Sequence, residues 1–124
     1  MRYRRAADQG FADAQFSLAL KYENGQGVPQ DYAEAARWYR KAAEQGNAIA
    51  ENSLGLMYYQ GQGVPQDYVQ AHLWLNLAAS RANSDRQKKY ADQRDLVAGK
   101  MTAEQIAEAQ RRAREWKPKG DGQR

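Results

Sequence analysis

The chain has 124 residues, of which 42% are hydrophobic and 27% charged, and it carries a net charge of +4 with no cysteine and one histidine. This length suffices for one folding unit, and the lack of cysteine excludes disulfides and thiolate metal sites. The sequence contains no apolar run of about 18 residues, and no apolar stretch follows the charged start MRYRRAADQG. We therefore expect a folded soluble chain without membrane insertion or a signal peptide. It would be cytoplasmic by default, and periplasmic or secreted if the true N-terminus is missing.

Residues 1–10 resemble the end of a segment that returns later in the chain. Tyr3–Gly10 reads YRRAADQG, and Tyr39–Gly46 reads YRKAAEQG. We interpret residues 1–10 as the C-terminal half of a truncated repeat. Because its first half is missing, this side of the fold is expected to expose apolar helix surface and to support self-association.

The next 72 residues form two near-copies. When residues 11–46 are aligned with residues 47–82, half of the positions are identical, including Leu18 with Leu54 and Trp38 with Trp74. A period in the thirties with this degree of identity is typical of a solenoid whose units stack on one another. We therefore assign one repeat to residues 11–46 and a second to residues 47–82.

Each unit is predicted to be a pair of helices. Apolar residues recur at helical spacing, and Gly25 can take the left-handed conformation that ends a helix over about 12–24. Asp31 is a good N-cap for a second helix that runs to Gly46. The segment GQGVPQD between the helices has neither a preceding strand nor the GK[ST] of a phosphate-binding loop, so we interpret it as a turn.

The composite pattern strongly resembles the Sel1-like repeat, a relative of the tetratricopeptide repeat. It reads A-x-A-Q-x-x-L-x-x-x-Y-x-x-G-x-G-V-P-x-D-x-x-x-A-x-x-W-Y-x-x-A-A-x-x-G over Ala12 to Gly46, and residues 48–79 fit it again. Ala19 stands where the family usually has glycine, as the second unit does at Gly55. The resemblance implies a right-handed α/α superhelix that serves as a scaffold or adaptor, commonly in bacterial signalling, envelope or host-interaction settings.

After Ala82 the repeated motif is lost. Capping boxes at Ser84 and Thr102 predict helices over about 85–98 and 103–116. Their apolar stripes would consist of Leu96, Val97, Met101, Ile106, Ala109, Ala113 and Trp116. The segment HLWLNLAA in the second unit is apolar nearly all round and must be covered. We therefore predict that residues 83–116 dock on the helix over 68–81 as a cap, followed by a disordered tail over 117–124.

The residues that could carry chemistry give no catalytic pattern. His72 is the only histidine, which excludes a histidine-based metal cluster, and we interpret it as a packing or surface residue. Asp31 and Asp67 could form an acid/base pair, but each already serves as a helix cap. Arg111, Arg112 and Arg114 lie among glutamates at ion-pair spacing, which indicates a solvated face rather than nucleic-acid binding.

In tetratricopeptide-like arrays the first helix of each unit lines a concave surface that binds partners. With Leu18 and Tyr22 turned inward, a helical wheel places on this surface Asp13, Phe16, Ser17, Leu20, Asn24, Ile49, Asn52, Ser53, Leu56 and Gln60. Several of these positions differ between the two units while the scaffold repeats, which suits recognition, although ordinary surface drift explains the differences equally well.

The sequence thus predicts a non-enzymatic, all-α scaffold that needs no cofactor or metal and binds a protein or peptide partner on its concave face. The alternative is a small-molecule-binding or hydrolytic repeat protein that uses a pair of carboxylates in its groove. A closed pocket with two pKa-shifted carboxylates would favour that alternative.

Overall fold

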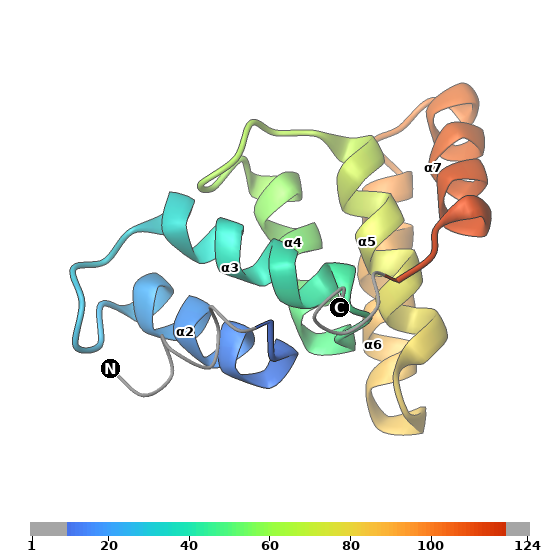
Figure 1. The fold of residues 1–124 in the computed structure, drawn as a ribbon. Helices are drawn as coiled ribbons and strands as arrows, with labels where there is room; N and C mark the ends of the chain where they lie inside the picture. The colour runs from blue at the N-terminus through green and yellow to red at the C-terminus, as the bar shows by residue number, and fades with distance from the viewer. Residues whose placement is uncertain (1–9, 119–124) are drawn as a thin grey trace.

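The computed structural model describes residues 10–118, which contain six α-helices and no strand (Figure 1). The helices are α2 (Ala12–Asn24), α3 (Tyr32–Glu44), α4 (Ala48–Gln60), α5 (Tyr68–Arg81), α6 (Ser84–Ala98) and α7 (Ala103–Glu115). The predicted all-α solenoid fold is confirmed. The predicted half-repeat before Gly10, with its self-association surface, and the tail beyond residue 118 lie outside the described residues.

The helices pack in chain order. Helix α2 packs on α3, α3 on α4, and α4 on α5, so the two helical pairs stack side by side (Figure 1). Both α6 and α7 then pack on α5. The predicted docking of the C-terminal helices on this helix is therefore observed.

The helix ends follow the predicted capping chemistry, with one correction. Oδ1 of Asp31 accepts a hydrogen bond from the backbone N–H of Glu34 at 3.1 Å, and Gly25 ends α2 in the left-handed conformation. Thr102 forms the predicted capping box at the start of α7. The cap of α6, however, is Asn83 rather than Ser84, because the Asn83 side chain accepts from the N–H of Arg86. Asparagine and serine cap helices about equally well, so the preceding residue could take the role.

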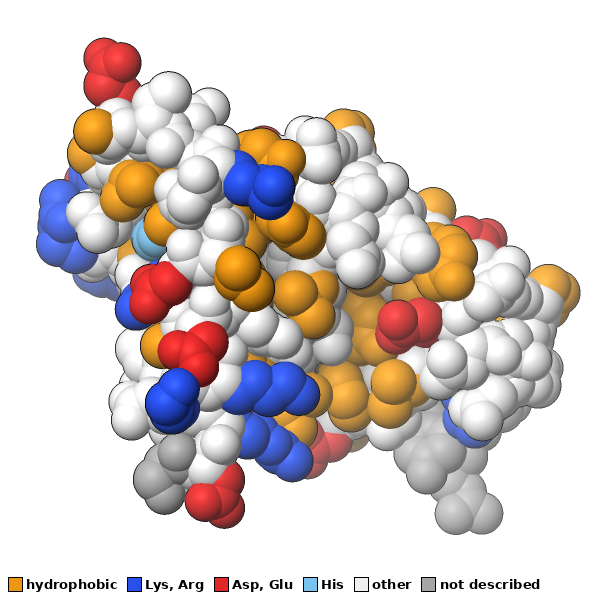
Figure 2. Space-filling view, turned by 180° about the vertical axis from the view of Figure 1, so that it is seen from behind, with side chains coloured by type: hydrophobic (Ala, Val, Ile, Leu, Met, Phe, Trp, Pro, Cys, Tyr) orange, Lys and Arg blue, Asp and Glu red, His pale blue; other side chains and the backbone are white. Residues whose placement is uncertain are grey.

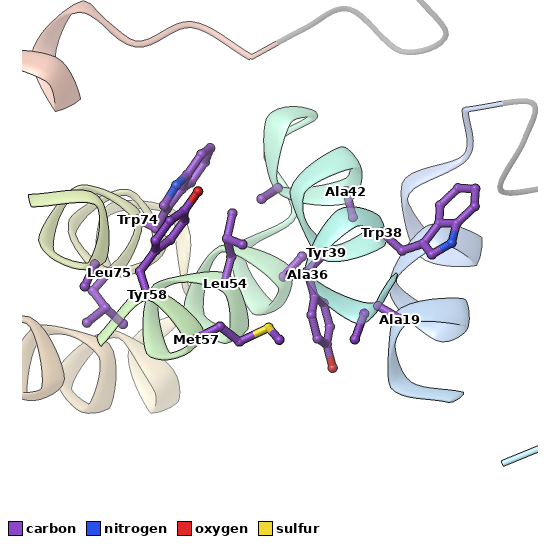
Figure 3. Close-up of a cluster of buried hydrophobic side chains, with 14 of the residues drawn as sticks. Ala19, Ala36, Trp38, Tyr39, Ala42, Leu54, Met57, Tyr58, Trp74 and Leu75 are labelled. Carbon is purple, nitrogen blue, oxygen red and sulfur yellow. The ribbon is translucent and has the colours of Figure 1, made fainter. Parts of the chain in front are cut away.

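The core between the helical pairs combines alanines with large side chains. Leu18 is buried, as predicted, and so are Leu54, Trp38 and Trp74, whereas Tyr22, also predicted to face inward, is only half-buried. Figure 3 shows Ala19 and Ala36 beside Tyr39 on one side of the cluster, and Leu54, Tyr58 and Trp74 together on the other. Small alanines bring the helix backbones close together, and the aromatic rings fill the remaining space.

The second unit differs from the first on the face that α6 and α7 cover. Leu73 and Leu77 of α5 are buried, whereas the equivalent residues of α3, Arg37 and Lys41, are exposed. Val97 of α6 is buried too, but Leu96 is 70% exposed, so its predicted place in the buried stripe is wrong. The two residues are adjacent on a helix and point about 100° apart. Once Val97 faces the core, Leu96 is turned to solvent.

The positions of α6 and α7 retain the spacing of the repeat although the motif is gone. Helix α6 begins at Ser84, 36 residues after Ala48, just as α4 begins 36 residues after Ala12. Helix α7 begins 35 residues after Tyr68, the first residue of α5. In the two repeats the second helix pairs with the first helix of its own unit, yet α7 packs mainly on α5. The last helical pair is therefore opened, with each of its helices on a different part of α5.

Candidate functional site

Tyr39 lies beneath the candidate surface, where α3 places it between α2 and α4. Its ring is fully buried, and Figure 3 shows it between Ala19 and Met57. The Tyr39 hydroxyl donates a hydrogen bond of 2.5 Å to Glu23 Oε1, and burial, followed by the neighbouring Glu23 carboxylate, raises the pKa of Tyr39. The side chain of Ser53 on α4 also bonds to the hydroxyl and lowers this pKa. Tyr39 therefore links the first helices of the two units.

The predicted surface residues differ in how open they are. Asp13, Leu20, Asn24 and Gln60 are exposed. Half-buried positions are Phe16, Ser17, Ile49, Ser53 and Leu56. Figure 2, the view from behind, shows hydrophobic side chains at the surface with charged ones beside them. The predicted surface thus combines exposed polar residues with the exposed Leu20 and half-buried apolar residues.

Like Ser53, the predicted residues Phe16 and Asn52 contact side chains of neighbouring helices. The Phe16 ring lies 5.8 Å from the ring of Tyr39, centroid to centroid, and packs against the core. Asn52 is 9% exposed and donates through Nδ2 to Gln93 Oε1 of α6 at 2.5 Å. Both side chains support the surface from its edges, and the open part consists of their neighbours. Neither Tyr39 nor Gln93 could be identified from the sequence, because each lies on a different helix from the predicted residues that it contacts.

A buried polar pair occupies equivalent places in the two units. In the first unit Gln45 Nε2 donates to Gln15 Oε1 at 2.8 Å. In the second unit the equivalent residues are Arg81 and Glu51, and Arg81 Nε lies 3.1 Å from both carboxylate oxygens of the fully buried Glu51. Burial raises the pKa of Glu51 to about 7, although Arg81 opposes the shift. A neutral amide pair in the first unit and an ion pair in the second thus make the equivalent contact within each unit.

The carboxylates and the histidine form no acid/base constellation among the described residues. Oδ1 of Asp31 and Oδ1 of Asp67 each accept a backbone N–H of their own helix. His72 is buried against α6, and burial, followed by the nearby Arg94, lowers its pKa while Asp95 raises it. Within residues 10–118 there is no cluster of three or more histidine, aspartate or glutamate side chains suited to a metal ion. Nor is any helix of that part long and apolar enough to cross a membrane.

Comparison with known proteins identifies the repeated unit. The sequence profile of the Sel1 repeat matches residues 3–11, 12–47 and 48–83. A protective antigen of uropathogenic Escherichia coli strains, which displays an SLR fold, superposes with a TM-score of 0.84 at 38% identity. A Sel1 repeat protein from Oxalobacter formigenes superposes with a TM-score of 0.68 at 44% identity.

The two alignments cover 92% and 73% of this chain. They cover only 24% and 26% of the respective structures, so this chain spans about a quarter of the length of each. A search of curated proteins finds no significant match.

Proposed function

The chain belongs to the Sel1 repeat family, and from this membership we propose that it binds a protein or peptide partner on a concave face formed by α2 and α4. Sel1 repeat proteins generally mediate protein–protein interactions, and the repeat is generally a non-enzymatic scaffold. The proposed contact residues are those that the helical wheel placed there, with Phe16 and Asn52 supporting the surface rather than forming its open part. Residues 11–46 and 47–82 act as the two binding units, and residues 83–116 cover α5.

The observation that carries this proposal is the pair of leucines at equivalent positions. Leu20 is 36% exposed, and its counterpart Leu56 in the second unit is half-buried. Nearby positions on the same face differ in polarity between the two units, since Asp13 of the first unit is equivalent to Ile49 of the second. An apolar row at fixed spacing within a variable polar frame supplies both the buried anchors and the specificity that a protein interface needs. A rigid array also loses little conformational entropy on binding.

The test begins with isolation of the partner from the native source on the immobilised chain. The isolated partner is then titrated against Leu20→Asp, Leu56→Asp and the control Ala33→Asp, which alters an exposed alanine of α3. A charge placed in an apolar anchor site is expected to weaken binding by about 2 kcal/mol or more. The control should bind like the wild type, and circular dichroism should show unchanged helicity in all three variants. Equal affinity of all four proteins would exclude this face as the binding surface.

A further inference from the structure

The opened pair of C-terminal helices leaves a groove that the proposed concave face does not include. Two open hollows lie along α5, one against α7 and the other against α6, and both are lined by Asn76 and Ser80. The two hollows therefore adjoin at Asn76 and Ser80 of α5, and we refer to them together as the groove and to α5 as its floor. The hollow against α7 has a volume of about 460 Å³, within the range of about 300–1,000 Å³ that is usual for ligand sites. In the view of Figure 1, α6 lies behind α5 and α7 to its right.

The lining of this groove is rich in side-chain amides. Asn76 lies on the floor, Gln110 on the α7 wall and Gln87 on the α6 wall, with small residues between them. An amide side chain offers one acceptor and two donor hydrogens, so it can pair with the C=O and N–H groups of an extended peptide backbone. Amides from three helices around one groove suit a polypeptide segment better than a compact apolar ligand.

The charged side chains that line the groove are both arginines. Arg94 lies on the α6 wall and Arg114 on the α7 wall, and none of the described residues that line the two hollows is acidic. Arg94 is held in place because its Nη1 donates to Asn76 Oδ1 at 2.9 Å and its Nε to Asp95 Oδ1 at 3.1 Å. Those bonds use two of the five N–H groups of a guanidinium.

Arg114 differs from its neighbours on α7. Arg111 pairs with Glu108 and Glu115, and Arg112 pairs with Glu108. Arg114 makes no ion pair with any of residues 10–118. The one arginine of this helix without a carboxylate partner in the described chain is thus the one that lines the groove.

We propose that this groove binds an extended acidic peptide segment of a partner protein. The side chains of Asn76, Gln87 and Gln110 hydrogen-bond to its backbone, while Arg94 and Arg114 receive its carboxylates from opposite walls. Guanidinium groups bind carboxylates through paired, charge-assisted hydrogen bonds, so two arginines select acidic over neutral or basic segments. The proposal is independent of the concave face, because none of the residues proposed for that face lines either hollow.

The test measures fluorescence anisotropy with a labelled nine-residue peptide of alternating glutamate and alanine. The matched peptide carries glutamine in place of glutamate. We expect saturable binding of the acidic peptide, binding of the neutral one that is at least tenfold weaker, and loss of affinity as salt is raised. Arg114→Gln should weaken binding about tenfold, as expected for a hydrogen bond to a charged group. Arg112→Gln, which makes the same charge change on the same helix outside the groove, should change the affinity less than twofold.

A second variant and a second readout make the result decisive. Ser80→Glu places a carboxylate on the exposed floor and should abolish binding, whereas Leu20→Asp on the concave face should leave it unchanged. Nuclear magnetic resonance of the labelled protein should show peptide-induced shifts of the Asn76 and Gln110 side-chain amides. Equal losses in Arg114→Gln and Arg112→Gln would reduce the effect to general attraction by the net positive charge and overturn the proposal. So would the absence of saturable binding, or shifts confined to α2 and α4.

Discussion

Gly63 in the loop of the second unit lies directly against the main-chain carbonyl of Tyr32 at the start of α3 in the first unit. A Cβ atom at Gly63 would overlap the oxygen and carbon of that carbonyl. Gly27, the equivalent residue of the first unit, has the same φ of 77° but open space around it. Gly27 and Gly63 therefore have the same backbone conformation, but only Gly63 is packed against another part of the chain.

This difference predicts unequal costs for the same substitution. Gly27→Ala should lose about 1–2 kcal/mol of unfolding free energy, because alanine is strained in the left-handed region. Gly63→Ala should lose about 1–3 kcal/mol more, because its methyl group also displaces the Tyr32 backbone. Urea unfolding of both variants measures the difference. Equal losses would show that the loop of the second unit does not press on the first.

Gly55 of α4 packs tightly against α5. A Cβ atom there would lie 2.9 Å from Leu75 Cγ and 3.2 Å from the Ala71 carbonyl oxygen. Gly55→Ala is therefore predicted to destabilise the fold by about 1–3 kcal/mol through overpacking. Gly99→Ala is the control, since Gly99 has a right-handed conformation and no contact closer than 3.4 Å. Thermal unfolding should show that the control is as stable as the wild type or slightly more stable. An unchanged stability of Gly55→Ala would mean that α4 and α5 are not tightly packed at this position.

The first unit accepts alanine at the equivalent position, Ala19, which is fully buried. The residue equivalent to Leu75 is Tyr39, which is also fully buried and lies beside Ala19 (Figure 3). The first unit therefore buries alanine and tyrosine where the second unit buries glycine and leucine.

The buried Glu51 carboxylate predicts a pH-dependent stability. Its pKa is raised to about 7 in the folded protein, against 4.5 for the free side chain. The folded state therefore holds the proton more tightly, so the contribution of Glu51 to stability is largest below about pH 4.5 and falls as the pH rises to about 7. The loss amounts to about 3 kcal/mol at most. Unfolding titrations at several pH values measure it.

Two variants isolate the contribution of Glu51. Glu51→Gln should remove the decline between about pH 4.5 and 7, and a slope that persists in this variant would assign it to another group. Arg81→Gln removes the cation that opposes the shift, so the decline should extend above pH 7. It should also cost about 3–5 kcal/mol at alkaline pH, because a buried charge is left without its partner.

Trp116, at the C-terminal end of α7, is predicted to hold that helix on α5. Its ring lies 6.0 Å from the ring of Trp74 in an edge-on arrangement, and the Arg81 guanidinium lies 4.6 Å over it. Trp116→Ala should cost about 2–3 kcal/mol through loss of both contacts and of buried area. Hydrogen exchange should speed up in α7 and stay unchanged in α2, with Trp116→Phe in between. Equal acceleration in α2 would assign Trp116 to global stability instead.

Much of the fold could be predicted because the chain contains two copies of the repeat, which can be aligned with each other. Two copies agree at Leu18 and Leu54 and at Trp38 and Trp74, so the buried frame can be read directly from their identity. The end of α2 at Gly25 and the start of α3 after Asp31 follow from local capping chemistry. These features depend on neighbours within a few residues, which a sequence displays.

The features that were missed depend on residues brought together by packing. The alignment of the two units shows that Gln15 and Gln45 are replaced by Glu51 and Arg81. It does not show that the two residues of each unit are hydrogen-bonded to each other, which only the structure reveals. The opened position of α7 has no local signal, because its helix start retains the spacing of the repeat. The groove along α5 follows from that position.

The two buried polar pairs also restrict how such a gene can change its length. In each pair the partners lie 30 residues apart, nearly a full unit. An unequal crossover between the two copies that fell inside this interval would join glutamine to arginine, or glutamate to glutamine. The product that joins glutamate to glutamine would bury a carboxylate without its counter-ion. The product that joins glutamine to arginine would leave the arginine without its carboxylate partner. Recombination can therefore add or delete units safely only at breakpoints that keep each pair together.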